Sequence, residues 1–164
     1  MANLPPTLTE PEFVELLDYW RRKSPPGRLP GRRDVDPMEL SPRLLPHVLL
    51  IDVVPGDSGP RFKFRLVGTG FVQLVGREVT GQFYDEIASP ERGAPVIAGL
   101  RKLVESGKPA YLEGPLTVPS RDFIWVKRLG LPLAEDGKTV DMILAAVLSG
   151  PRPRNASAGP GDDD

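Results

Sequence analysis

An alternating run, RFKFRLVG at residues 61–68, constrains the fold of this chain more than any other segment. Successive side chains of a β-strand point to opposite faces, so the run predicts a strand with Phe62, Phe64 and Leu66 on its buried face. The apolar run VLLIDVV at residues 48–54 predicts a second strand, and PGDSGP between the two runs is typical of a tight turn. The two runs therefore predict an antiparallel hairpin.

The remainder of the chain predicts more strands and a set of helices. Three further strand patterns lie at about residues 110–118, 123–133 and 140–148. Short helical segments follow the hairpin, and a longer helix is predicted over residues 90–106, with Gly107 at its end. Strands and helices in this order indicate an α+β domain.

An amphipathic helix is predicted near the N-terminus, over about residues 10–23. Thr9 followed by Glu12 fits a capping box. Four apolar side chains recur at helical spacing and form one stripe: Phe13, Leu16, Leu17 and Trp20. Such a stripe either folds back on the sheet of its own chain or pairs with a second subunit in a homodimer, and the sequence leaves both alternatives open.

The hairpin runs into Gly68-Thr69-Gly70, which resembles the start of a dinucleotide-binding turn. That fingerprint needs a third glycine three residues after the second, where this chain has Gln73. The broken fingerprint argues against dinucleotide binding and leaves a bend between strand and helix as the alternative for these glycines. Glycine suits a bend because it adopts positive φ and lets two backbones come close.

Several longer motifs follow one another along the chain. They are LLDYWR at residues 16–21, LPGRRDVDP at 29–37, LLPHVLLIDV at 44–53, FRLVGTG at 64–70, GREVTG at 76–81 and LGLPLAEDG at 129–137. In these motifs the sequence resembles a family of short bacterial PAS-like proteins, over about residues 11–148. The resemblance implies a five-stranded antiparallel sheet in the order 2-1-5-4-3, with helices on one face and an N-terminal helical extension.

The resemblance also suggests how the chain is divided. Residues 1–46 would form the amphipathic helix and a proline-rich connector, and residues 47–149 the PAS-like domain. Residues 150–164 lack periodicity and end in three aspartates, so we expect them to be disordered.

Composition argues against several classes of function. The net charge is −1, with 21 basic and 22 acidic residues, so nothing favours binding to nucleic acid. The sequence has no run of about 20 apolar residues and no secretory signal, so we expect a cytoplasmic protein that does not enter a membrane. It also has no cysteine, which excludes disulfides, thiolate catalysis and a flavin–thiol adduct.

The resemblance implies that helices and the inner sheet face can enclose a small cavity. Tyr84 and Trp125 are the best candidates for its wall, because each carries a polar group that needs a partner when buried. Each candidate has the alternative role of densely packed core. The candidate ligand-pocket residues are Phe64, Leu66, Phe71, Leu74, Phe83, Tyr84, Ile97, Leu100, Leu112, Trp125, Leu129 and Ile143.

The sequence identifies no cofactor and requires none. His47 is the sole histidine and precedes the first strand, whereas heme-binding PAS relatives usually place a histidine on the long helix. This argues against heme, and a single histidine is poor evidence for a metal site. A noncovalent flavin stays compatible with the sequence.

The resemblance favours a non-catalytic sensory or regulatory module that binds a small ligand or a partner protein in bacterial signalling, with no catalytic residues. One alternative is a small isomerase-like enzyme, in which Asp85 or Glu86 acts as a desolvated base with a raised pKa at the floor of the cavity. The other is an interaction adaptor with a filled core and no ligand.

Overall fold

The fold was obtained as a computed structural model, which describes residues 4–5 and 8–154. The predicted tail lies outside the described residues from residue 155 onward, so its disorder stays a prediction. The helices are α1 (Pro11–Lys23), α2 (Thr69–Val75), α3 (Tyr84–Ile87) and α4 (Pro90–Ser106), with short 3-10 turns η1 (Arg32–Asp34), η2 (Pro37–Glu39) and η3 (Leu45–His47). The strands are β1 (Val48–Val54), β2 (Arg61–Val67), β3 (Ala110–Pro115), β4 (Trp125–Leu133) and β5 (Met142–Ser149).

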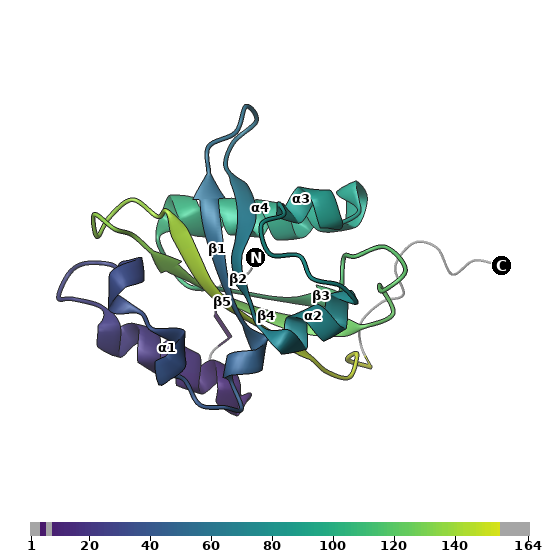
Figure 1. Ribbon diagram of the computed structural model, residues 1–164, viewed down its shortest axis with the longest axis horizontal. Coiled ribbons are helices and arrows are strands. Elements are labelled where there is room, and N and C mark those ends of the chain that lie inside the picture. The colour runs from purple at the N-terminus through teal and green to yellow at the C-terminus, as the bar shows by residue number, and fades with distance from the viewer. Residues whose placement is uncertain (1–3, 6–7, 155–164) are drawn as a thin grey trace.

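The five strands form one antiparallel sheet in the order β2-β1-β5-β4-β3, which confirms the predicted topology. Figure 1 shows α1 on one side of this sheet and α4 on the other. Apolar side chains therefore fill two separate clusters, one on each face. This explains why β1 and β5 are apolar at nearly every position, since a strand covered on both faces has no solvent-facing side.

The N-terminal helix α1 packs on the sheet of its own chain. Phe13 and Leu16 are fully buried there, and Leu17 is nearly so. The ring of Phe13 meets the ring of Tyr111 edge to face, with 6.2 Å between the centroids. The indole nitrogen of Trp20 donates a hydrogen bond of 2.8 Å to the carbonyl oxygen of Pro132. A second subunit could use this stripe only if α1 left the sheet.

The start of α1 differs from the prediction. The residue that caps the helix is Glu10, without a side-chain hydrogen bond to the helix, so the capping box proposed for Thr9 and Glu12 is wrong. Glu10 instead forms an ion pair of 2.6 Å with Lys127 of β4. Pro11 occupies the first helical position, where its missing N–H costs nothing.

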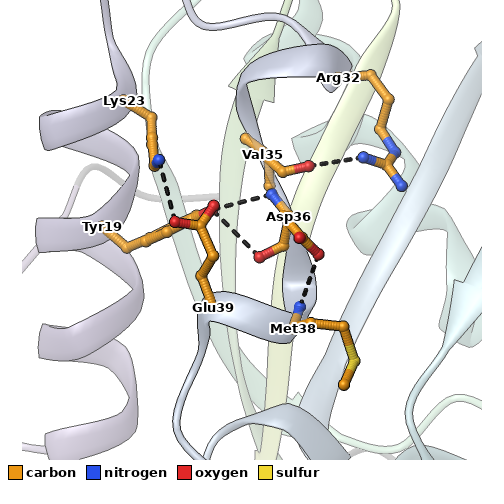
Figure 2. A network of polar contacts seen from close by, with 7 residues as sticks. All are labelled: Tyr19, Lys23, Arg32, Val35, Asp36, Met38 and Glu39. Atoms are coloured by element: carbon orange, nitrogen blue, oxygen red, sulfur yellow. Dashed lines mark hydrogen bonds and ion pairs between the residues drawn. The ribbon is translucent and has the colours of Figure 1, made fainter.

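Tyr19 ties α1 to the connector that follows it (Figure 2). Its hydroxyl accepts a hydrogen bond of 2.9 Å from the backbone nitrogen of Asp36 and donates one of 2.9 Å to Glu39, which also binds Lys23. The Asp36 carboxylate in turn accepts from the backbone nitrogen of Met38. The motifs at residues 16–21 and 29–37 are thus joined by one hydrogen-bond network, which holds the connector against α1.

The bend at Gly68 and Gly70 is real, and it depends on close approach of two backbone segments. Gly68 has a φ of −66°, which any residue can adopt. A Cβ at Gly68, however, would lie far closer to the carbonyl oxygen of Pro46 in η3 than the 3.0 Å that real Cβ atoms keep. Left-handed backbone occurs beyond the bend, where Gly76 has a φ of 91° at the end of α2.

Candidate functional site

A cavity of about 50 Å³ lies between the sheet and the helices α3 and α4. Its wall is mostly apolar and includes three side chains with polar groups, Tyr84, Thr117 and Arg128. The complete wall consists of Leu49, Ile51, Phe64, Phe71, Tyr84, Ile87, Val96, Leu100, Leu116, Thr117, Val118, Arg128, Leu129, Gly130, Ala145 and Val147.

The structure brings five of the sequence-derived pocket candidates to this wall: Phe64, Phe71, Tyr84, Leu100 and Leu129. The rings of Phe64 and Phe71 pack together with 5.7 Å between their centroids, and Tyr84 meets Phe64 at 6.4 Å. Leu129 borders the cavity although its side chain packs in the cluster on the α1 face. Whether any of these residues contacts a ligand stays a prediction.

Leu66 lies away from the cavity because the pairing of β1 and β2 is irregular. Leu50 pairs with Leu66 and Ile51 pairs with Phe64, so β2 carries one extra residue, Arg65, between them. A bulge of this kind interrupts the alternation of side chains. Leu66 therefore packs in the cluster on the α1 face, while Phe64 packs in the cluster on the cavity face.

Trp125 is absent from the cavity wall because its position in the alternation of β4 assigns its side chain to the opposite face of the sheet. Val126 packs on the cavity face, whereas Leu131 and Leu133 pack on the α1 face. Successive strand residues alternate, so Trp125 falls with the second set. Its indole nitrogen is buried without a hydrogen-bond partner in the described part of the chain.

The other five candidates also lie outside the wall of the cavity. Phe83 sits at the edge of the sheet with the guanidinium of Arg61 above its ring, 3.8 Å from the centroid. The remaining four pack around the cluster on the cavity face: Leu74, Ile97, Leu112 and Ile143.

The polar side chains of the wall are connected to one another and to the segment after β3. The hydroxyls of Tyr84 and Thr117 form a hydrogen bond with each other. Burial raises the pKa of Tyr84, so this hydroxyl keeps its proton at neutral pH. Nη2 of Arg128 donates a hydrogen bond of 2.8 Å to the carbonyl oxygen of Pro115, and the carbonyl oxygen of Thr117 accepts 3.0 Å from the backbone nitrogen of Ser89.

Sequence reasoning missed Arg128, although a signal was present. Lys127 and Arg128 are consecutive residues of a strand, so they must point to opposite faces. Lys127 reaches Glu10 at the start of α1. Arg128 consequently points to the cavity face, where it is only 9% exposed.

Asp85 does not have the environment that the isomerase hypothesis requires. Its carboxylate forms two hydrogen bonds with the Arg61 guanidinium, at 2.7 and 2.8 Å, and its side chain is 38% exposed. The hydrogen bonds from Arg61 lower the pKa of Asp85, whereas a base at the floor of the cavity needed a raised pKa. Glu86 accepts a hydrogen bond from the backbone nitrogen of Phe83. Neither carboxylate lines the cavity, so the placement predicted for a catalytic base is wrong.

Asp85 should instead contribute a small acid-sensitive part of the stability. A pKa lowered in the folded state stabilises the protein above the unfolded pKa of about 3.9, and that contribution disappears as the pH falls through the folded pKa. Asp85→Asn should lower the Tm by less than about 3 °C at pH 7 and reduce the difference in Tm between pH 7 and pH 3. Thermal unfolding at both pH values, with the exposed Asp18→Asn as control, checks this. An unchanged pH dependence would contradict it.

The described residues offer little to a metal or a large cofactor. Across residues 4–5 and 8–154, no three histidine, aspartate or glutamate side chains gather to hold a metal ion. His47 packs against the bend, where a Cβ at Gly70 would lie 3.0 Å from its Nδ1 atom. Ligand pockets for larger molecules measure roughly 300–1,000 Å³. The cavity would have to expand several-fold to hold a flavin or a heme.

Comparison with known proteins identifies the class of protein. A family model of the PAS domain matches residues 8–148, and this chain belongs to that family. No curated protein matches the sequence.

Solved structures show the same fold. The Rhodobacter sphaeroides LOV protein is 16% identical in sequence to this chain, with a TM-score of 0.51. The match covers 66% of this chain and 61% of the LOV protein chain. The RsLOV d2 variant is 14% identical over 90% of this chain and 72% of its own, with a TM-score of 0.50. This chain thus spans 61% of the length of the Rhodobacter sphaeroides LOV protein. At these identities the similarity establishes the fold alone.

Within the part of the chain that the structure describes, no helix is both long enough and apolar enough to cross a bilayer.

Proposed function

We propose that this chain is a non-catalytic sensory module, in which a small molecule in the cavity alters the packing of the helices and thereby the association with a signalling partner protein. Members of the PAS domain family are typically non-catalytic sensor modules. The observation that carries the proposal is the cavity between the sheet and the helices α3 and α4, with a mostly apolar wall and a few polar groups. Binding sites for small molecules have this composition.

Strand β4 offers a route from the cavity to α1. Arg128 and Gly130 line the cavity, whereas the side chains of Leu129 and Leu131 pack in the cluster that holds α1. Trp20 of α1 bonds to the backbone of the same strand at Pro132. A ligand that shifts β4 on one face therefore shifts the surface on which α1 rests. A ligand can change this equilibrium only by as much as it binds one packing better than the other.

Native mass spectrometry of freshly purified protein tests the proposal. We expect a fraction of the protein to carry an additional small mass that is lost on unfolding. The rate of amide hydrogen exchange in α1 should differ at least twofold between the freshly purified protein, which carries the small molecule, and protein refolded without it. Protein that carries no added mass, and whose α1 exchanges equally in both preparations, would support the ligand-free adaptor instead.

A matched pair of substitutions locates the binding. Ala145 lies on the cavity wall, so Ala145→Leu adds three carbons toward the cavity and should abolish the added mass. Ala98 is an exposed residue of α4, so Ala98→Leu adds the same carbons outside the core and should retain it. Loss of the added mass in both variants, or in neither, would place the binding elsewhere.

A further inference from the structure

Arg128 is a buried cation directed at the cavity. Its residue is 9% exposed, and it lies on the cavity face of β4. A guanidinium has five N–H donors. One of them is used in the hydrogen bond to the carbonyl oxygen of Pro115. No second hydrogen bond of this guanidinium is seen within the part of the chain that the structure describes.

No carboxylate neutralises this cation in the part of the chain that the structure describes. The ion pairs there join other residues, and the effects on the pKa of Arg128 come from burial, which lowers it, and from Tyr84, without a contribution from any aspartate or glutamate. A buried charge is ordinarily paired, because leaving it without a partner is costly. A bound anion would supply the negative charge that the guanidinium of Arg128 lacks.

Two other polar side chains, Tyr84 and Thr117, line the same cavity as Arg128. Tyr84 is close enough to influence the pKa of Arg128, and its hydroxyl is bonded to that of Thr117. One hydroxyl proton is used in that bond, so the other hydroxyl can still donate to an incoming oxygen. The cavity wall thus carries a guanidinium and two hydroxyls, and no aspartate or glutamate lines it.

The rest of the cavity wall is mostly apolar and favours a ligand with a hydrocarbon portion. The wall also includes five large apolar side chains: Phe64, Phe71, Val96, Leu100 and Leu116. The cavity of about 50 Å³ has room for only a few non-hydrogen atoms, since one water needs roughly 10–15 Å³ of such space. A bare inorganic anion would leave the apolar wall without contacts.

We propose that the cavity binds a short-chain aliphatic carboxylate, whose carboxylate group pairs with the guanidinium of Arg128 beside the hydroxyls of Tyr84 and Thr117. This inference rests on the proposed sensory function and names its ligand class. A guanidinium and a carboxylate form two parallel hydrogen bonds, which would also fix the orientation of the chain of the acid. The other role for Arg128 is purely structural, as an anchor for Pro115.

Isothermal titration of the full chain with acetate, propionate, butyrate and hexanoate at pH 7 tests the inference. Propionamide, phosphate and chloride serve as comparison ligands. We expect propionate or butyrate to bind best and hexanoate to bind weakly because of its length. Propionamide, which has the shape of propionate without its charge, should bind at least tenfold more weakly. Equal binding of acid and amide, or no binding of any acid, would overturn the proposal.

A substitution at Arg128 separates the binding role from the structural role. Arg128→Met removes the charge but keeps the length and apolar character of the side chain. We expect propionate affinity to fall at least tenfold while the Tm stays equal or rises, because replacing a buried charge by an apolar side chain is often neutral or stabilising. Arg65→Met removes the same charge from a side chain that is 66% exposed, and it should leave affinity unchanged. A fall in Tm with unchanged affinity would show a structural anchor only.

The outcomes distinguish this inference from the function on which it rests. A neutral molecule found by native mass spectrometry, together with no response to carboxylates, would overturn the carboxylate and keep the sensory module. If phosphate or chloride bound as tightly as propionate, the ligand class would be small anions in general. The claim that the ligand carries an aliphatic chain would then be overturned. If Arg128→Met did not fold, the comparison of propionate with propionamide on the unmodified chain would still decide.

Discussion

Replacing Gly68 by alanine should lower the free energy of unfolding by about 3 kcal/mol, at the upper end of the usual cost of overpacking. The added Cβ would overlap the carbonyl group of Pro46 and lie 2.9 Å from the carbonyl oxygen of Leu45. Both are backbone atoms, which cannot rotate away as a flexible side chain does. Relief would require η3 and the start of α2 to move apart. Urea unfolding followed by circular dichroism measures the loss.

Gly150→Ala is the matched control for this prediction. The nearest atom to a Cβ at Gly150 is the end of the flexible Lys127 side chain, at 4.0 Å, and the φ of Gly150 is not positive. We expect its stability to stay within about 0.5 kcal/mol of the unmodified protein. A Gly68→Ala variant that matched this control would show that the bend has room to open.

Phe13→Ala should cost about 3–5 kcal/mol, the usual range for a large aromatic side chain removed from a core. Phe13 is fully buried between α1 and the sheet, where its ring contacts Tyr111. The neighbouring Val14 is 39% exposed, so Val14→Ala should change the stability by less than about 0.5 kcal/mol. Urea unfolding of the two variants checks the difference.

The same pair of variants tests where α1 resides. If Phe13→Ala were as stable as Val14→Ala, α1 would not be docked on the sheet in solution, and its apolar stripe would be available to a second subunit. Light scattering on the unmodified chain would then show a dimer. A large loss of stability in Phe13→Ala alone fits α1 as part of the core of its own chain.

Much of the fold could be predicted because local patterns and longer motifs agreed. The hairpin, the late strands and the helix at residues 90–106 each follow from periodicity and turn residues. The strand order needed the resemblance, since periodicity does not say which strands are neighbours. The prediction that Leu66 faces the cavity was wrong because the alternation in RFKFRLVG looks unbroken, and the extra residue at Arg65 exists only relative to the pairing with β1.

The site was less accessible to sequence reasoning because the faces of β4 could not be assigned from apolar character. Leu129, Leu131 and Leu133 follow a clean alternation, but they pack under α1. Once both faces of a sheet are covered, apolar residues no longer distinguish inside from outside. The informative positions are then the charged ones. The adjacent Lys127 and Arg128 require that one of two cations point into each covered face.

The sheet that carries β4 is a single layer of backbone, and α1 lies on one side of it (Figure 1). The cavity lies on the other side of the same layer. Neighbouring residues of one strand thus face either the ligand cavity or the packing surface of α1, and these two environments make different chemical demands. A substitution on one face can shift the shared backbone and so disturb the packing on the other face. A substitution that adjusts ligand preference would tend to need a compensating change one residue along, on the opposite side. Pairs of adjacent positions on β4 and β5 should accordingly vary together among relatives, and engineers who alter specificity here should randomise both.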